Sequence, residues 1–172
     1  MFENIIKNVH NRHPLIHCIT NYVSINDCAN IVLACGGAPI MAEDINEVSQ
    51  ITSICQGLDI NIGMLNDNKL SSMLKAGATA NELGIPVILD PVGAGSSDYR
   101  IKAVQNLMSN VQFGVIRGNV SEIKAIAEKQ GIHNIAAGVY ETMQKNKSAM
   151  GVEAGIADKI TDDNIKAVSY TH

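Results

Sequence analysis

The chain has 172 residues, of which 46% are hydrophobic and 17% are charged, and its formal net charge is −4. This length is typical of one domain, and the composition excludes a disordered chain, a collagen-like repeat and a charged coiled coil. An acidic balance without a basic cluster argues against nucleic-acid binding, and an aromatic content of 3% without Trp argues against base stacking. We therefore expect residues 1–172 to form a single domain that binds no nucleic acid.

The cellular location is predicted from features that are absent from the sequence. No stretch approaches the ~20 apolar residues of a membrane-spanning helix. The first residues form neither the basic region nor the apolar run of a secretory signal. The cysteines, at positions 18, 28, 35 and 55, match neither a zinc-binding pair nor a small disulfide framework. We expect a cytoplasmic protein without membrane contact, whose thiols are reduced and mostly buried.

Short apolar runs alternate with longer segments of helical period. The runs predict strands at Leu15–Ile19, Ala38–Met41, 58–62, 86–90 and 113–117. The spacing between them leaves room for a crossover helix each time, and near-continuous apolar runs are typical of strands buried on both faces. This alternation predicts an α/β domain with a parallel sheet and right-handed crossovers.

The first of these crossover helices has apolar side chains that share one face: Ile25, Cys28, Ala29, Val32 and Leu33. Ser24 can cap its start, and Gly36 can end it. Asp44 followed by Glu47 resembles a capping arrangement for the next helix.

The pattern weakens after Gly131, where three further glycines interrupt the segment. Two helical stretches are predicted, near 136–145 and 162–170, and no further strand follows them. The chain ends where the alternation requires another strand. We therefore expect a domain that is truncated at its C-terminus.

In an open parallel sheet, ligands bind beyond the carboxyl ends of the strands. Polar groups follow the predicted strands in five segments: 20–22, 41–44, 63–66, 90–95 and 117–119. Because these segments should meet at one rim of the sheet, together they are a stronger indication of a site than any single motif.

Asp90 closes an apolar strand and enters a glycine-rich turn. A carboxylate there can hold Mg²⁺ directly or through water, and Gly93 and Gly95 allow a ligand close to the backbone. The alternative is a structural aspartate before Pro91. The turn is not a dinucleotide fingerprint, because its third glycine is absent, and the sequence has no Walker A motif.

Arg117 ends the last predicted strand, and Asn119 stands at the start of a helix. The guanidinium, the helix dipole and the backbone N–H groups predict a phosphate site. The alternative is an arginine paired with a surface carboxylate. Glu122 fits a capping box with Asn119, and its other possible role is a second carboxylate for metal or water near Asp90.

Three histidines, His10, His13 and His17, are interpreted as exposed or hydrogen-bonded structural residues, because no Ser or Cys has a recognisable nucleophile setting. Met41, at a strand end, fits the core. If the rim binds a ligand, its flexible thioether would suit a flat heteroaromatic ring.

Four sequence runs cover residues 13 to about 125 in order: HPLIHCITNYVSINDCANIVLACGGAPIMAED, LDINIGMLN, GIPVILDPVGAGSS and GVIRGNVSEI. Together they resemble the hydroxyethylthiazole kinases of thiamine salvage, which are similar in fold to ribokinase. The resemblance implies a three-layer, ribokinase-like α/β fold with a mostly parallel sheet flanked by helices. Composition and periodicity predict only the α/β class.

The resemblance also implies ATP- and Mg²⁺-dependent phosphorylation of the hydroxyl of 4-methyl-5-(2-hydroxyethyl)thiazole. It implies a homotrimer whose thiazole sites lie between subunits. Three residues fall near the thiazole: Met41, Asn21 and Val23. The ATP phosphates are assigned to Arg117 and Asn119, and the metal to Asp90 and Glu122.

The family's pattern continues with an ATP-contacting threonine and a glycine-rich loop whose cysteine lies by the reacting hydroxyl. No such loop precedes His172, so no catalytic residue is assigned. Two alternatives stay open. One is another ribokinase-like vitamin kinase or an ADP-dependent hydrate dehydratase, and the other is a non-catalytic binding or oligomerising remnant.

Overall fold

The computed structural model describes residues 2–129, 154–156 and 166–170. The helices in these ranges are α1 Phe2–Arg12, α2 Ile25–Ala34, α3 Val48–Ser53, α4 Asp67–Glu82, α5 Asp98–Asn110 and α6 Val120–Lys129. The strands are β1 Leu15–Ile19, β2 Ala38–Met41, β3 Gly57–Asn61, β4 Val87–Asp90, β5 Val115–Gly118, β6 Ala154–Ile156 and β7 Lys166–Tyr170. None of these helices is both long and apolar enough to cross a membrane.

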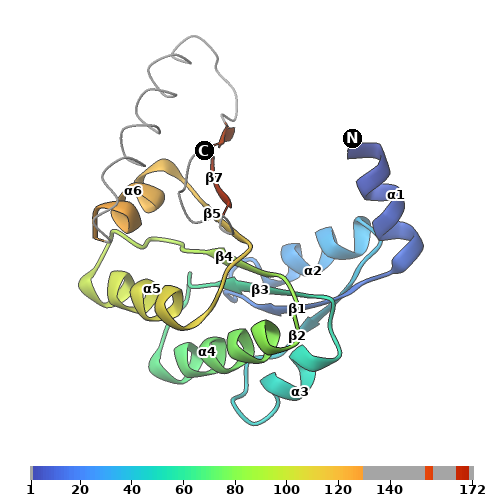
Figure 1. Cartoon of the computed structure of the whole chain (residues 1–172), viewed down its shortest axis with the longest axis horizontal. Coiled ribbons are helices and arrows are strands. Elements are labelled where there is room, and N and C mark those ends of the chain that lie inside the picture. The colour runs from blue at the N-terminus through green and yellow to red at the C-terminus, as the bar shows by residue number, and fades with distance from the viewer. Residues whose placement is uncertain (1, 130–153, 157–165, 171–172) are drawn as a thin grey trace.

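Within the described ranges, the strands form one sheet in the order β2-β1-β3-β4-β5-β7-β6. All neighbouring pairs are parallel except β6 and β7. Helices α3, α4 and α5 cover one face of the sheet, and α2 lies on the other face (Figure 1). The prediction of a mostly parallel sheet flanked by helices is therefore confirmed.

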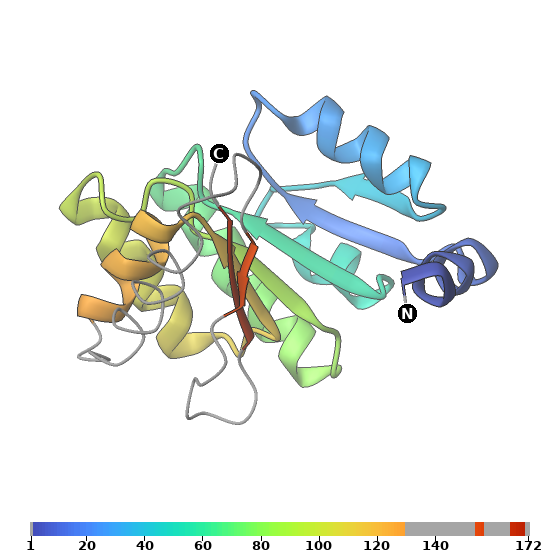
Figure 2. The same cartoon turned by 90° about the horizontal axis from the view of Figure 1, so that it is seen from above.

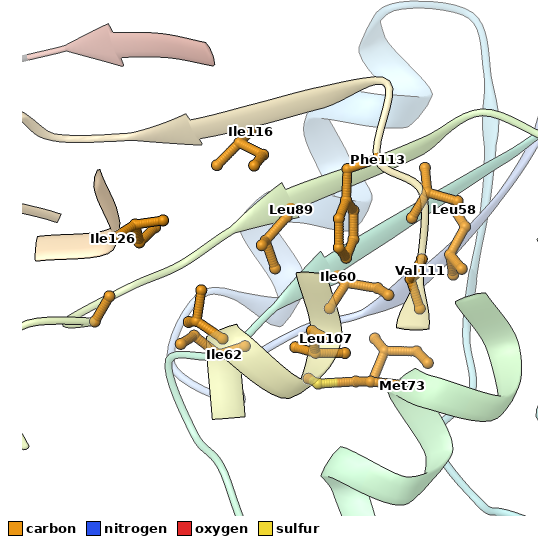
Figure 3. Close-up of a cluster of buried hydrophobic side chains, with 14 of the residues drawn as sticks. Leu58, Ile60, Ile62, Met73, Leu89, Leu107, Val111, Phe113, Ile116 and Ile126 are labelled. Carbon is orange, nitrogen blue, oxygen red and sulfur yellow. The ribbon is translucent and has the colours of Figure 1, made fainter. Parts of the chain in front are cut away.

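The main core lies between the sheet and the helices α4 and α5. Leu58, Ile60 and Leu89 point from the strands toward Met73 on α4 and Leu107 on α5 (Figure 3). All five side chains are almost fully buried. Since burying one such side chain stabilises the fold by about 1.5–3 kcal/mol, this cluster holds the strand ends in fixed positions.

The opposite face of the sheet is only partly covered. Seen from above, α2 lies beside β1 and β2, and among the described helices none lies over the middle of this face (Figure 2). Ile88, on this face of β4, is 40% exposed, and α2 has no buried residue. The predicted apolar face of α2 therefore contributes no buried side chain to the core, and Ile31 and Leu33 are more than half exposed.

The helix boundaries agree in part with their predicted caps. Gly36, with a φ of +91°, ends α2 as expected. Ser24 occupies the N-cap of α2, but its side chain makes no capping hydrogen bond. Asp44 accepts a hydrogen bond from the backbone of Asn46, and Glu47 takes the N-cap position of α3. The Asp44 side chain thus stabilises the turn before α3.

The expectations for the last forty residues need one correction. The predicted helix near 162–170 is wrong, because residues 166–170 form strand β7, which pairs in parallel with β5. Tyr and Val at alternate positions favour a strand, and pairing with β5 outweighs the local helical pattern. Strand β6, at Ala154–Ile156, lies between the two predicted helical stretches and was not expected either. The predicted helix at 136–145 lies outside the described residues.

All four cysteines are free thiols, as expected. Cys18 and Cys55 are buried, Cys28 is partly buried and Cys35 is exposed, so only half of them lie in the interior. Burial raises the pKa of the Cys18 thiol to about 12, and the nearby Asp59 charge adds to this effect. Cys18 therefore behaves as a small apolar side chain at neutral pH.

Candidate functional site

The candidate site lies where the order of the strands reverses. The chain runs from β1 to β2 through α2 on one face of the sheet, and from β2 to β3 through α3 on the other (Figure 1). In sheets of this kind, ligands bind in the crevice outside the carboxyl ends of the strands at this reversal point. In this sheet the reversal falls at the carboxyl ends of β1 and β3, which have β2 and β4 as their outer neighbours.

A line of hydrogen bonds crosses this rim from β1 to β5. Asn21 Nδ2 donates to Asn61 Oδ1 over 3.2 Å, and Asn61 Nδ2 donates to Asp90 Oδ2 over 3.1 Å. Arg117 Nη1 lies 3.3 Å from the same Asp90 oxygen. The structure therefore brings together three residues that the sequence indicated separately, and Asn61 joins them.

The register of the parallel strands explains this line. Asn61 is paired with Asp90, and Leu89 with Ile116, so Asp90 and Arg117 stand at the same level of the sheet. Alternate residues of a strand share a face, and Leu58, Ile60 and Leu89 already occupy the core face. The polar side chains at the ends of β3, β4 and β5 consequently share the open face.

Asn61 was missed by the sequence analysis. It is the last residue of β3 and is 7% exposed. Its Oδ1 also accepts a hydrogen bond from the backbone of Gly63 over 2.8 Å, which fixes the orientation of the amide. The sequence did contain a signal for Asn61, since a polar residue at the end of an apolar strand also indicated Asp90.

The open face carries a second carboxylate, at Asp59 on β3. Burial raises its pKa to about 6, and the charge of Asp90 adds to the shift, while the Arg117 guanidinium lowers it. Arg117 is the cation that both acids face, and its side chain is 51% exposed. Its guanidinium is therefore accessible to a ligand as well as to Asp90.

Glu122 joins the glycine-rich turn to the start of α6. Its backbone N–H donates to Asn119 Oδ1 over 3.0 Å, and its Oε2 accepts from the backbone of Asn119 over 2.8 Å. This reciprocal pair confirms the capping box. Glu122 Oε1 accepts a third bond from the backbone of Gly93, whose φ is +67°. The turn after β4 and the helix after β5 are thus held together beside Asp90.

Arg100 on α5 fixes the loops that follow β3 and β4. Its Nη1 donates to the carbonyls of Ile62 and Val92 over 2.7 and 2.8 Å, and its Nη2 donates to the carbonyl of Gly63 over 2.8 Å. Three carbonyls from two loops converge on one guanidinium. This arginine was also missed, because nothing in its own helix indicates which loops it reaches.

The residues expected near the thiazole lie at the β1–β2 side of the rim. Asn21 Oδ1 accepts from the backbone and the hydroxyl of Ser24, and these bonds shape the loop after β1. Met41 ends β2 and is partly buried, and Val23 is 89% exposed. The Tyr22 hydroxyl donates to Glu43, which ties the loop after β1 to the loop after β2.

His17 is buried and hydrogen-bonded, as expected of a structural histidine. Its Nε2 lies 2.8 Å from the Ala42 carbonyl and its Nδ1 lies 2.9 Å from the Thr52 hydroxyl. Burial lowers its pKa, although the bond to Ala42 acts in the opposite direction. His13 is exposed beside the Gly36 carbonyl. Among the described residues, neither ring is hydrogen-bonded to a Ser or Cys side chain.

A cavity of ≈ 450 Å³ lies between the turn at 94–98 and α6. Two acidic residues, Asp98 and Glu128, contribute to its lining. Their charges disfavour an anionic ligand there, so the cationic corner at Arg117 is the better position for phosphate.

The acidic groups at the rim have carboxylate oxygens, which are the type of ligand that Mg²⁺ prefers. In the described part of the chain, no three His, Cys, Asp or Glu side chains gather into a complete metal site. Mg²⁺ needs no such site, because it is usually held by one or two carboxylates, water and substrate phosphates. Asp90 and Glu122 carry oxygen ligands of that kind and are the candidates to hold the ion, and both Glu122 oxygens also accept backbone N–H bonds from Asn119 and Gly93.

The fold and this rim define a doubly wound α/β protein with a candidate ligand site near its strand-order reversal. Residues 6–164 match the model of the hydroxyethylthiazole kinase family. The hydroxyethylthiazole kinase of Clostridium acetobutylicum is 52% identical over 98% of this chain, and that of Alkaliphilus metalliredigens is 48% identical over 93%. A solved structure, of a hydroxyethylthiazole kinase protein from Pyrococcus horikoshii OT3, covers 81% of this chain with a TM-score of 0.74 and 38% identity.

The chain therefore belongs to the hydroxyethylthiazole kinase family. The matches cover 56% and 62% of the two bacterial relatives and 54% of the Pyrococcus chain. The chain thus spans little more than half the length of the relatives that it matches.

Proposed function

We propose that this chain carries the substrate-binding rim of a kinase that phosphorylates the hydroxyl of 4-methyl-5-(2-hydroxyethyl)thiazole with ATP. One observation carries the proposal: the line from Asn21 through Asn61 and Asp90 to Arg117, in a member of this family. The alcohol side and the phosphate side of a phosphoryl transfer would lie at its two ends. The names of the relatives support the substrate.

The reaction transfers the γ-phosphoryl group to the alcohol oxygen, breaks its bond to ADP and releases the hydroxyl proton. Such a transfer depends mainly on alignment and on offsetting charge at the phosphate oxygens. Arg117 would donate N–H bonds to those oxygens, and the capping box of Asn119 and Glu122 would hold the N-terminus of α6 behind it. Mg²⁺, bound by Asp90 and Glu122, would supply further positive charge to the phosphates.

On the alcohol side, Met41, Asn21 and Val23 would contact the thiazole. A second copy of the chain would complete this pocket, as in the homotrimer that the family resemblance implies. The exposure of Val23 supports this arrangement, and so do the half-exposed Ile31 and Leu33 on α2. Apolar side chains that no residue of their own chain covers are typical of subunit interfaces. We also place the protein in the cytoplasm, which the four free thiols favour.

The direct test is a phosphorylation assay on two proteins. One is this chain, and the other, called the completed protein below, joins it to the portion of the Clostridium acetobutylicum relative that it does not match. With ATP and Mg²⁺, the completed protein should convert the thiazole alcohol to its phosphate ester. No ester formation by the completed protein would refute the substrate assignment.

Competition among alcohols in the same assay separates the related vitamin kinases. The thiazole alcohol should outcompete other vitamin precursors with a primary hydroxyl. If another alcohol is phosphorylated preferentially, the enzyme class survives but the substrate is wrong.

A further inference from the structure

A buried lysine connects the two loops that carry the proposed thiazole contacts. Lys69, on α4, is only 4% exposed. Its Nζ donates to the carbonyl of Thr20 over 2.5 Å and lies 2.8 Å from Glu43 Oε2. It also lies 4.6 Å from the centre of the Tyr22 ring. A buried ammonium is costly unless it is paired, and here three groups from two loops pair with it.

Each partner of Lys69 belongs to a loop at the rim. Thr20 and Tyr22 lie in the loop after β1, on either side of Asn21. Met41 is the last residue of β2, and Glu43 lies two residues after it, in the loop that follows. The Tyr22 hydroxyl donates to the second oxygen of the Glu43 carboxylate, so the two loops are also bonded directly to each other.

The charge state of Glu43 agrees with this pairing. Burial alone would raise the pKa of its carboxyl group, but the bonds from Lys69 and Tyr22 outweigh burial and hold it below its ordinary value. The Glu43 carboxyl group is therefore ionised at neutral pH, and its Oε2 lies within hydrogen-bond distance of Lys69 Nζ.

We propose that Lys69 is a positioning residue for the alcohol pocket, which sets the loop of Asn21 and Val23 against the end of β2 at Met41. This inference rests on the proposed function. Lys69 does not touch the substrate; it acts through Thr20 and Glu43. The phosphate side has separate supports, since Arg100 and Glu122 hold the loops around Asp90. Loss of Lys69 should therefore disturb alcohol binding and leave ATP binding nearly unchanged.

The chain offers a matched control on the same helix. Lys75 also donates its Nζ to a backbone carbonyl, that of Ile45, over 2.8 Å, but at an exposed position. Lys69→Met and Lys75→Met thus remove the same group from α4, once from the buried cluster and once from the surface.

The kinetic experiment uses the completed protein and compares the KM values for the alcohol and for ATP. Lys69→Met should raise the alcohol KM about tenfold or more, with the ATP KM changed less than about twofold. Lys75→Met should leave both KM values within about twofold. An equal rise of both KM values in Lys69→Met, or no rise, would overturn the proposal.

A double variant separates positioning from stability. Lys69→Met alone leaves the Glu43 carboxylate without its cation, whereas Lys69→Met with Glu43→Gln removes both charges. The double variant should regain part of the thermal stability that Lys69→Met loses. It should keep the raised alcohol KM, because Lys69 no longer connects the two loops. If the double variant regains both the stability and the alcohol KM of the unsubstituted protein, Lys69 has only a structural role and the proposal is wrong.

Amide hydrogen exchange in this chain tests the loops without any activity. Lys69→Met should speed exchange at residues 20–23 and 41–43 about tenfold relative to residues 90–93, and Lys75→Met should not. Unchanged exchange in Lys69→Met would refute the positioning role. A completed protein that is inactive without any substitution would instead refute the proposed function, so the two failures are distinct.

Discussion

The Asp90 carboxylate lies 3.3 Å from the Arg117 guanidinium, although 27 residues separate the two in the chain. Neighbouring parallel strands place them side by side at the same rim, which is where the sequence analysis expected an acidic corner and a phosphate-binding arginine to meet. The acid is largely buried and the arginine is half exposed. The acid can therefore orient the guanidinium of a side chain that is still half exposed at the rim.

Replacement of Arg117 by alanine tests its proposed role at the phosphates. An arginine–phosphate bond is worth about 1.5–3 kcal/mol, so Arg117→Ala in the completed protein should weaken ATP binding about 10- to 100-fold. The half-exposed pair with Asp90 should contribute less than about 1 kcal/mol to folding. Calorimetric titration with ATP and urea denaturation measure the two effects.

Lys124→Ala is the control for the lost positive charge, because Lys124 pairs with Glu128 on the surface of α6. It should leave ATP affinity within about twofold. If Arg117→Ala reduced stability and ATP binding in equal measure, Arg117 would be a structural arginine.

Asn61 should be needed for stability as well as for the line across the rim. Asn61→Leu leaves the backbone N–H of Gly63 and the carboxylate of Asp90 each without one hydrogen bond in a buried setting. The expected loss is about 2–4 kcal/mol in the free energy of unfolding, measured by urea denaturation. The substitution also removes the partner of the Asn21 amide.

Asn81→Leu is the matched control. Asn81 makes two hydrogen bonds with the backbone of Gln112, but at an exposed position away from the rim. Because water can replace those bonds, its cost should be about 1 kcal/mol or less. Similar losses for both asparagines would contradict the importance of the line.

Gly77 on α4 should not tolerate a methyl group. A Cβ there would lie 2.5 Å from Val111 Cγ2 and 2.7 Å from Val111 Cγ1. The clash should outweigh the better helix propensity of alanine, and Gly77→Ala should cost about 1–3 kcal/mol. Adding Val111→Ala should recover part of that loss. Thermal denaturation of the single and double variants measures the coupling, and simple additivity would argue against the clash.

His17 should make the fold sensitive to acid. Burial lowers its pKa below the 6.5 of an unfolded chain, so the unfolded state takes up a proton at a higher pH than the folded state. The stability from His17 is therefore complete above pH 6.5 and is lost as the pH falls from 6.5 through the lowered folded value. Between pH 7 and pH 5, the contribution of His17 to the free energy of unfolding should therefore fall, whereas Asp59, whose pKa burial raises to about 6, acts in the opposite direction.

Two substitutions isolate the contribution of His17 to the pH dependence of the free energy of unfolding. The difference in the free energy of unfolding between the unsubstituted chain and His17→Gln should decrease as the pH falls from 7 to 5, whereas the difference for His10→Gln, at an exposed position, should stay constant. Urea denaturation at several pH values is the measurement. A difference that stays constant with pH for His17→Gln would contradict the lowered pKa of His17.

The strands could be predicted from the sequence because buried parallel strands are local apolar runs. The expected strands at 58–62 and 113–117 differ from β3 and β5 by two residues or fewer at each end. The capping box at Asn119 was also visible, because it depends on residues three apart. Strand β7 was missed because its strongest determinant, pairing with β5, is not local.

The connecting residues of the rim could not be predicted for the same physical reason. Asn61 joins Asn21 to Asp90 only because the register aligns β3 with β4. Lys69 donates to a carbonyl 49 residues away along the chain. Arg100 donates to two carbonyls that are 37 and 38 residues away, and to that of Val92, which is 8 residues away. Residues at the strand ends could therefore be predicted from the sequence, and the residues that hold them together could not.

The central claim is that the phosphates of ATP bind against Arg117, opposite Asp90. A crystal structure of the completed protein with Mg²⁺ and a non-hydrolysable ATP analogue tests it most directly. We expect phosphate oxygens within hydrogen-bond distance of the Arg117 guanidinium, with Mg²⁺ on the Asp90 side. Phosphates bound elsewhere, with the Arg117–Asp90 pair intact and away from the nucleotide, would contradict the account.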